Sequence, residues 1–400
     1  MISVAEAVEV VLRETTQLNA EFVPLDEALG YVLAREAVAD MDLPPFDRAQ
    51  MDGYAVRAAD TARVPARLRV VGEAAAGRAW GGEVQAGEAV RIMTGAPVPV
   101  GADAVQQVEL TREAEGVVEI SKEVAVGHSV VPRGAEVRAG ATVIAAGEVI
   151  NSGVLAVLAA FGYAEVPVFR RPRVAVIATG SELVRVAERP GVAQIRDSNS
   201  YSLTALARGA GAEVARLPLA GDDLETLTEQ IAEGASRADV LILSGGVSVG
   251  TYDFTKAALR ALGAEIFFER VALKPGKPTV FARLGGKLIF GLPGNPVSVA
   301  VTFSLFARPA LRAMPGGRTP VLPEESARLT QPVKGAAERA SYLPATLAVD
   351  DSGGLTATPL RWGGSSDFVG FAHSTALIIV PPHAGKLSTG ALVRIIRLPD

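Results

Sequence analysis

The spacing of apolar residues changes several times along the chain, and each change predicts a different element. Near the start, apolar side chains recur three and four residues apart, at Val4, Val8, Val11 and Leu12. This spacing places them on one face of a helix. Helical spacing returns over 149–161. We therefore expect a discontinuous, helical framework domain made of 1–42 and 139–168.

The region between these two pieces has the pattern of a β-rich module, with short strands separated by Gly and Pro turns. Its predicted strands are Leu68–Gly72, Glu88–Met93, Ala104–Glu109 and Val117–Ser121. A turn at Met51–Tyr54 exposes Asp52 ahead of a strand, although Asp-Gly is also an ordinary turn pair. We expect an inserted β-rich domain over 43–138.

Residues 169–319 alternate short apolar strands with helical patterns, which predicts a three-layer α/β domain with a parallel sheet. The predicted strands are Val174–Ala178, Glu213–Leu219, Asp239–Leu243, Val280–Arg283 and Lys287–Phe290. Residues 320–400 return to short strands and turns, which predicts a C-terminal β-barrel after a hinge at 315–320. The expected fold class is multidomain, α/β plus β.

Gly-rich or small-residue turns follow several strands of the α/β region, at Thr179–Glu182, Ser244–Gly250 and Gly291–Ser298. Such a turn before a helix lets backbone N–H groups approach an anion. Each turn alone would also fit an ordinary strand-to-helix connection. Because the carboxyl ends of parallel strands share one edge of a sheet, we expect all three turns to line one crevice.

Composition and charge exclude several kinds of function. The 400 residues are 49% hydrophobic and 21% charged, as in a folded globular protein. The net charge of -5 argues against a nucleic-acid partner. The chain has no Cys and only 3 His, which argues against thiol catalysis and His-ligated metals. No uncharged apolar run approaches the roughly 18 residues of a membrane span, and the start does not look like a signal peptide, so we expect a cytoplasmic protein without a membrane partner.

The predicted crevice would contain carboxylates and, from a chain that strongly prefers Arg, the two lysines of Lys274–Pro278. Carboxylates beside phosphates indicate a divalent cation such as Mg²⁺. Each acid alone would also suit a solvated loop. Without a His or Cys nucleophile pair or a P-loop motif, the set favours phosphoryl or nucleotidyl chemistry by positioning and electrostatics.

Five ordered motifs resemble those of the molybdopterin molybdenumtransferases, the family that includes the gephyrin E domain. They are Ser-Gly-Gly-Val-Ser-Val-Gly-Thr-Tyr-Asp (244–253), Lys-Pro-Gly-Lys-Pro (274–278), Gly-Leu-Pro-Gly-Asn-Pro-Val-Ser (291–298), Pro-Phe-Asp-Arg-Ala-Gln-Met-Asp-Gly-Tyr-Ala-Val (45–56) and Ile-Met-Thr-Gly-Ala-Pro-Val-Pro-Val-Gly-Ala-Asp (92–103). The resemblance implies a four-domain homodimer, dimerised through its framework domain. It also implies Mg²⁺-dependent insertion of molybdate into adenylylated molybdopterin with release of AMP. Implied partners are a molybdopterin adenylyltransferase and molybdoenzyme apoproteins or their chaperones.

The resemblance also implies roles for individual residues. The implied catalytic residues are Asp52, Glu182, Asp222, Asp253, Lys274 and Lys277, of which Glu182, Asp222 and Asp253 are implied metal ligands. The implied substrate-binding residues are Thr179, Gly180, Ser244, Gly245, Gly246, Ser248, Gly250, Pro293, Gly294, Asn295, Pro296, Ser298, Glu136, Arg339 and Ser366. Within these sets, molybdate would meet Lys274, Lys277, Ser298, Arg339 and the Ser365–Ser366 loop, and Asp52 and Glu136 would reach the crevice of the partner subunit.

The chain departs from the family pattern at two places. Arg48-Ala49 stands where the family usually has Asn-Ser, which removes a hydroxyl near the Asp52 turn. Glu136 stands where the family has Asp, which lengthens the acid by one methylene. Both departures concern the part that would reach a partner subunit.

Two other functions fit parts of the chain. A molybdopterin adenylyltransferase shares the 169–315 type of domain but needs neither the inserted module nor the C-terminal barrel. A scaffold protein would retain the fold and bind a peptide partner, as gephyrin does. The retained Lys274, Lys277, Asp222 and Asp253 argue against a purely structural role.

Overall fold

The computed structural model describes residues 1–247, 254–361 and 363–399. The chain divides into two compact units. The first comprises Met1–Arg35, Gly147–Asn151 and Glu165–Asp400, and the second Glu36–Ala146 and Ser152–Ala164. The finer division into domains at 43–138, 169–319 and 320–400 stays a prediction. Among the described residues, no helix is both long and apolar enough to span a membrane.

The centre of the first unit is a sheet in the order β17-β14-β18-β22-β21-β19. These strands are Glu213–Arg216, Arg173–Ala178, Val240–Ser244, Lys287–Leu292, Val280–Leu284 and Glu265–Phe268. The first four run parallel, whereas β21 is antiparallel to both β22 and β19. The parallel sheet predicted from the sequence is therefore mixed. The reason is the two-residue Gly285-Gly286 turn between β21 and β22, because so short a connection can only form a hairpin.

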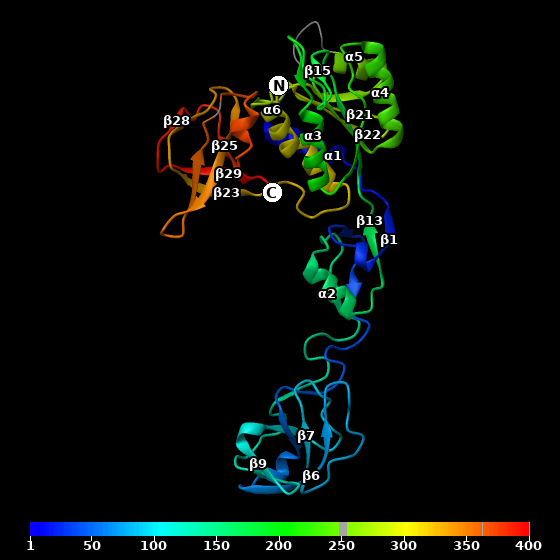
Figure 1. The fold of residues 1–400 in the computed structure, drawn as a ribbon, viewed down its shortest axis with the longest axis vertical. Coiled ribbons are helices and arrows are strands. Elements are labelled where there is room, and N and C mark those ends of the chain that lie inside the picture. The colour runs from blue at the N-terminus through cyan, green and yellow to red at the C-terminus, as the bar shows by residue number, and fades with distance from the viewer. Residues whose placement is uncertain (248–253, 362, 400) are drawn as a thin grey trace. The chain divides into compact units, whose positions relative to one another are not determined.

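Helices cover both faces of this sheet and complete the three layers (Figure 1). Val176 and Ile242 pack with one hydrophobic cluster, which includes side chains of α1, α3 and α6. Their neighbours Ile177 and Leu243 pack with a second cluster, which includes α4 and α5. Successive strand residues point to opposite faces, so strands buried on both faces are apolar at nearly every position. The helices are α1 (Val4–Glu14), α3 (Asn199–Gly209), α4 (Leu224–Arg237), α5 (Phe254–Ala261) and α6 (Pro296–Thr302), which continues through a π-helical turn η4 (Phe303–Ala307) into α7 (Arg308–Ala313).

The N-terminal framework is less helical than its sequence pattern suggested. Helix α1 forms as predicted, with Ser3 and Glu6 in a capping box. After it the chain forms a small antiparallel sheet instead of further helix. Its strands are β1 (Ala20–Pro24), β13 (Glu165–Phe169) and β2 (Val32–Leu33), with only a 3₁₀ turn η1 (Leu25–Glu27) between β1 and β2. Strand pairing with residues more than a hundred positions away overrides the local helical pattern here.

The C-terminal part of the first unit is a closed barrel, as predicted. Its strands follow the order β25-β26-β23-β29-β27, and β27 pairs back with β25 to close it. They are Ala340–Val349, Leu355–Pro359, Glu324–Leu329, Leu392–Arg397 and Ala376–Val380. Ala345, Ile378 and Ile395 are fully buried in its core. This part also contains three short strands and a short helix. Strand β20 (Leu273–Lys274) pairs with β25, and β24 (Val333–Lys334) pairs with β28 (Lys386–Leu387). The helix is α8 (Phe368–Phe371).

The second unit contains the predicted β-rich module. Its main sheet has the order β8-β5-β7-β6-β10-β9. These strands are Ala104–Gln107, Gly53–Val56, Glu88–Ile92, Ala66–Ala74, Val117–Ile120 and Thr111–Ala114. The unit also contains the pairs β3 (Ala37–Val38) with β12 (Thr142–Ile144) and β4 (Arg48–Ala49) with β11 (Val130–Val131), the 3₁₀ turns η2 (Ala58–Thr61) and η3 (Val108–Leu110), and helix α2 (Ser152–Ala160).

One ion pair anchors the start of the central strand β18. Arg170 donates to both carboxylate oxygens of Asp239, at 2.6 and 2.8 Å, and the amide of Arg173 donates at 2.9 Å. Burial alone would raise the pKa of Asp239, but these hydrogen bonds outweigh it and lower the pKa below its usual 3.8. The pair therefore connects the segment before β14 to the start of β18.

Asp239→Asn is expected to lower the free energy of unfolding by about 2 kcal/mol at neutral pH, since it removes charge-assisted hydrogen bonds. Because folding lowers the pKa of Asp239, this stabilisation is complete at neutral pH and disappears as the pH falls below the ordinary value of 3.8. Urea unfolding at several pH values tests this. The exposed Asp351→Asn is the control, and an equal loss in both variants would contradict the prediction.

Candidate functional site

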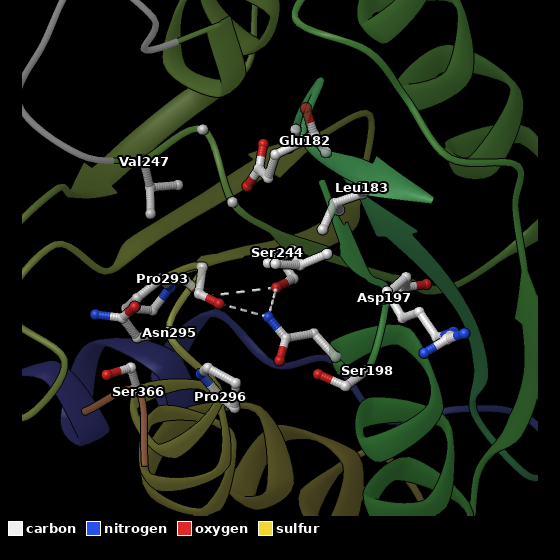
Figure 2. A pocket seen from close by; sticks show the side chains of 18 of the residues that line it. Glu182, Leu183, Asp197, Ser198, Ser244, Val247, Pro293, Asn295, Pro296 and Ser366 are labelled. Atoms are coloured by element: carbon white, nitrogen blue, oxygen red, sulfur yellow. Dashed lines mark hydrogen bonds between the residues drawn. The ribbon is translucent and has the colours of Figure 1, made fainter. Parts of the chain in front are cut away.

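A cavity of about 1020 Å³ lies at the carboxyl edge of the sheet in the first unit (Figure 2). Described parts of all three predicted turns line it, together with the start of α3 and a loop of the barrel. The lining residues are Thr179, Gly180, Glu182, Leu183, Pro190, Gln194, Ile195, Arg196, Asp197, Ser198, Asn199, Asp222, Ser244, Gly245, Gly246, Val247, Pro278, Pro293, Gly294, Asn295, Pro296, Ser366 and Phe368. The expected single crevice is thus present in the described residues.

The first turn follows β14 and positions two acids. The backbone amide and the hydroxyl of Ser181 both donate to the same oxygen of Asp222, at 3.2 and 2.5 Å. Glu182 folds back over Gly180, so that a Cβ added to Gly180 would lie 2.4 Å from a carboxylate oxygen of Glu182. Both carboxylates therefore lie at one wall of the cavity, where they add negative charge beside the glycine turns.

The second turn follows β18 and packs directly against the first. The amide of Thr179 donates to the carbonyl of Ser244 at 2.9 Å. Gly245 has φ +101°, and a Cβ placed on it would lie only 2.3 Å from the carbonyl oxygen of Thr179. A side chain cannot be accommodated at this distance. Gly245 is therefore required by the packing of the two turns, whether or not its amide contacts a ligand.

Asn199, at the start of α3, connects the second and third turns. Its side-chain amide nitrogen donates to the hydroxyl of Ser244 at 2.9 Å and to the carbonyl of Gly294 at 2.7 Å. Figure 2 shows hydrogen bonds as dashed lines that meet near Ser244 and Pro293. The Oδ1 of Asn199 and the Oγ1 of Thr179 are buried, and neither has a hydrogen-bond partner among the residues that the structure describes. Such unsatisfied groups are rare away from functional sites, since each costs free energy.

The third turn leads into α6 and receives a loop of the barrel. Asn295 donates through its side chain to the hydroxyl of Ser365 at 2.8 Å, and the amide of Val297 donates to the carbonyl of Ser365 at 3.1 Å. These contacts bring Ser366 to the cavity wall beside Asn295 and Pro296 (Figure 2). The amides of Gly363 and Gly370 donate to Asp367 and lower its pKa, so this residue is a carboxylate that shapes the loop.

Comparisons with known proteins agree with this geometry. The chain matches the MoeA N-terminal region (domains I and II) over residues 2–162, a probable molybdopterin binding domain over 175–313 and the MoeA C-terminal region (domain IV) over 326–398. It is 36% identical to the molybdopterin molybdenumtransferase of Bacillus subtilis (strain 168), with 100% of this chain and 94% of the relative covered. The chain belongs to the molybdopterin molybdenumtransferase family.

Other relatives agree with this assignment. The Staphylococcus aureus (strain COL) molybdopterin molybdenumtransferase is 36% identical, with 99% of this chain and 95% of the relative covered. A crystal structure of a molybdopterin biosynthesis MoeA protein from Pyrococcus horikoshii superposes with a TM-score of 0.86 at 33% identity, covering 100% of both chains. The protein is thus a transferase of molybdenum cofactor biosynthesis.

The residues that the family resemblance assigned to molybdate, apart from Ser366, lie outside the cavity lining. Lys274 and Lys277 are exposed. Arg339 donates to the carbonyl of Leu273 at 3.3 Å, which places it beside Lys274 at the start of β20. Ser298 is buried within α6, and only 3% of its surface is exposed. Their roles toward molybdate stay a prediction.

Two further predicted residues, Asp52 and Glu136, belong to the second unit. The amide and hydroxyl of Thr94 each donate to Asp52 at 2.7 Å and lower its pKa. Glu136 accepts a hydrogen bond from Arg48 at 3.1 Å. The two departures from the family pattern thus contact each other. As an exposed ion pair this contact adds little stability, but it positions the longer acid.

The predicted residues Ser248, Gly250 and Asp253 lie outside the residues that the structure describes. Asp253 was one of the implied metal ligands. Among the described residues, no group of three or more His, Asp or Glu side chains could hold a metal ion. Among the acids that line the cavity, Glu182 and Asp222 lie together at the wall formed by the first turn.

Sequence reasoning missed Asn199 and the Ser181 hydroxyl that holds Asp222. It also omitted the neighbouring lining residues Gln194, Arg196, Asp197 and Ser198. The polar triplet Asp197-Ser198-Asn199 ahead of an apolar helical run is typical of a helix N-terminus. That signal could have placed the triplet near the carboxyl edge of the sheet. It could not show that Asn199 bonds to two distant turns.

Gly245→Ala is expected to destabilise the protein by about 2 kcal/mol or more, because alanine at a positive φ is strained and its Cβ meets the Thr179 carbonyl. The matched variant Gly294→Ala adds the same methyl group, and within the described parts of the chain this methyl group would approach only the Cα of Gly245, at 3.8 Å. Its unfolding free energy should stay within about 0.5 kcal/mol of the wild type. Denaturant unfolding measures both, and equal stability of the two variants would refute the packing argument.

Asn199→Ala removes both hydrogen bonds between the turns and is expected to lower the unfolding free energy by about 2 kcal/mol. Asn199→Asp should cost at least as much, because a carboxylate oxygen would then face the Gly294 carbonyl. Thermal and urea unfolding provide the measurement, with Ser202→Ala on the exposed face of α3 as the control. Wild-type stability of Asn199→Asp would exclude the proposed connection.

Proposed function

We propose that the cavity of the first unit binds adenylylated molybdopterin and that the protein inserts molybdate into it with release of AMP. The observation that carries this proposal is the meeting of three turns with the carboxylates of Glu182 and Asp222 in one cavity of a chain of this family. Its volume of about 1020 Å³ is at the upper end for small-molecule sites and suits a large, nucleotide-bearing substrate.

Release of AMP requires an oxygen of water or molybdate to attack one phosphorus of the phosphoanhydride, so that a new P–O bond forms as the bond between the adenylyl group and the pterin phosphate breaks. Negative charge then develops on the oxygen that bridges the two phosphorus atoms. The glycine turns at 179–180 and 245–246 let phosphates approach the backbone closely, which supports placing the two phosphates there. Asn199 and Ser244 hold the turns in position without themselves supplying a charge.

The cavity also fits Mg²⁺ by the chemistry of its donors. Mg²⁺ takes a few carboxylate oxygens and completes its shell with water and substrate phosphates. Glu182 and Asp222 provide such oxygens in the described wall, and we propose that they hold the ion together with the predicted Asp253. When bound, Mg²⁺ would neutralise phosphate charge beside these acids. The Ser181 bonds that fix Asp222 would orient one of the ligands.

The remaining parts of the proposal rest on the family resemblance. We propose a cytoplasmic homodimer in which Asp52 and Glu136 of one subunit serve the cavity of the other. Lys274, Lys277 and Arg339 would receive molybdate, since lysine supplies a compact positive charge and arginine a planar fork of N–H donors to an oxyanion. A molybdopterin adenylyltransferase would supply the substrate, and molybdoenzyme apoproteins or their chaperones would accept the product.

Asp222→Asn is expected to reduce AMP release by about 100-fold, since it removes a charge at the phosphate end of the cavity. Asparagine retains an oxygen for the Ser181 hydrogen bonds, so the folded structure should persist. The assay combines purified protein, adenylylated molybdopterin, molybdate and Mg²⁺, and quantifies AMP by chromatography.

The adjacent Asp223 provides a matched control for this experiment. Asp223 caps α4 by accepting from the amide of Thr226 at 2.8 Å and does not line the cavity. Asparagine caps helices equally well, so Asp223→Asn should release AMP at the wild-type rate. Unchanged activity of Asp222→Asn would show that this acid is a bystander. Attachment of AMP from ATP by the wild type would instead favour the adenylyltransferase.

A further inference from the structure

A second cavity of about 570 Å³ shares the lining residue Asp197 with the first. Its volume falls within the range of small-molecule sites. Three segments line it, namely the loop after β15 (Leu183–Val184), helix α3 and the end of β17 with the residues that follow. The lining residues are Arg185, Val186, Ala187, Asp197, Ser200, Tyr201, Thr204, Arg208, Val214, Arg216, Leu217, Pro218 and Leu219.

The charge of this cavity is unusual for a protein with a net charge of -5. Arg185, Arg208 and Arg216 come from different segments, and none of them has an acidic partner among the described residues. The acid in the described lining is Asp197, whose oxygens both accept hydrogen bonds from Ser200, one of them from the amide at 3.0 Å. Three exposed guanidinium groups therefore line one hollow, where their positive charges favour an anion.

The arginine on β17 is already held in position. The guanidinium of Arg216 stacks on the ring of Tyr201 at 3.9 Å from its centroid. Stacking fixes the plane of the group but leaves its N–H donors free at the edge, where they can bind an oxyanion with two parallel hydrogen bonds. Val214, Leu217 and Leu219 add an apolar surface in the same hollow.

We propose that this cavity binds a phosphate-bearing small molecule with an apolar or ring portion. The phosphate would contact Arg185, Arg208 and Arg216, and the apolar portion would lie against Val214 and the leucines. This inference does not depend on the proposed function, because none of the three arginines lines the first cavity.

Occupancy of this cavity would also affect the loop that separates it from the first. Strands β15 and β16 (Ile195–Arg196) pair in parallel and hold the ends of the 185–194 segment. Residues of this segment line both cavities, since Arg185 faces the second and Gln194 the first. A phosphate between Arg185 and the two arginines of the α3–β17 side would connect this loop to the rest of the domain. We therefore expect slower opening of the loop in the bound state.

The experiment titrates the full-length protein with phenyl phosphate, and in a second series with inorganic phosphate, at an ionic strength kept constant with NaCl. Hydrogen exchange of peptides that cover 185–194 reports binding. Saturable protection is expected in the wild type, with tighter binding of phenyl phosphate than of inorganic phosphate. In Arg216→Gln the dissociation constant should rise about tenfold or more, as for the loss of a charge-assisted hydrogen bond.

Control variants distinguish specific binding in this cavity from nonspecific electrostatic binding of the anion to the protein. Arg67→Gln removes an exposed arginine of the second unit and should bind as the wild type does. Tyr201→Phe keeps the stacked ring and should retain affinity, whereas Tyr201→Leu should weaken binding. If Arg216→Gln fails to fold, Arg208→Gln and Arg185→Gln provide the same test. The proposal is overturned if protection does not saturate at constant ionic strength, or if it is equal in these variants and the wild type.

Discussion

The site depends on how closely the turns after β14 and β18 approach each other. The parallel pairing of β14 with β18 extends to Ala178 and Ser244. The residues that follow each strand must therefore turn at the same edge of the sheet. The Thr179 carbonyl then lies where a side chain on the opposite turn would be, and only glycine can occupy position 245. Gly245 is thus explained first by the room that the Thr179 backbone needs, and the space for phosphates follows from it.

Polar side chains then connect the turns into one wall. Asn199 bonds to the second and third turns at once, and Ser365 bonds to the start of α6. Asn199 belongs to helix α3, and Ser365 belongs to a loop of the barrel. The barrel therefore completes the cavity of the α/β domain by contributing Ser366 and Phe368, which gives a physical reason why the transferase carries a C-terminal domain.

The second unit shows how two sequence departures can belong together. Arg48 and Glu136, which the sequence resemblance identifies as departures from the family pattern, form an ion pair at 3.1 Å. The Arg48 strand pairs with β11, which brings the two residues together although they are 88 positions apart. The ion pair with Arg48 holds the carboxylate of the longer Glu136 side chain in one position at this surface. Either change alone would leave a charge without this partner.

Most of the elements, and the family, could be predicted from the amino-acid sequence alone. Apolar runs buried on both faces and recurrent Gly turns identified the α/β domain and the edge where its cavity lies, because these patterns reflect local requirements for burial and backbone conformation. The short Gly285-Gly286 turn indicates that β21 is antiparallel to β22, although the alternation of strands and helices predicted a parallel sheet. Tertiary structure alone decided that Asn199 connects two turns, that Ser298 is buried within α6, and that Arg185, Arg208 and Arg216 surround one cavity. These relations join residues far apart in the chain, and a hydrogen bond or a shared cavity between them depends on distances of a few ångströms that no local pattern records.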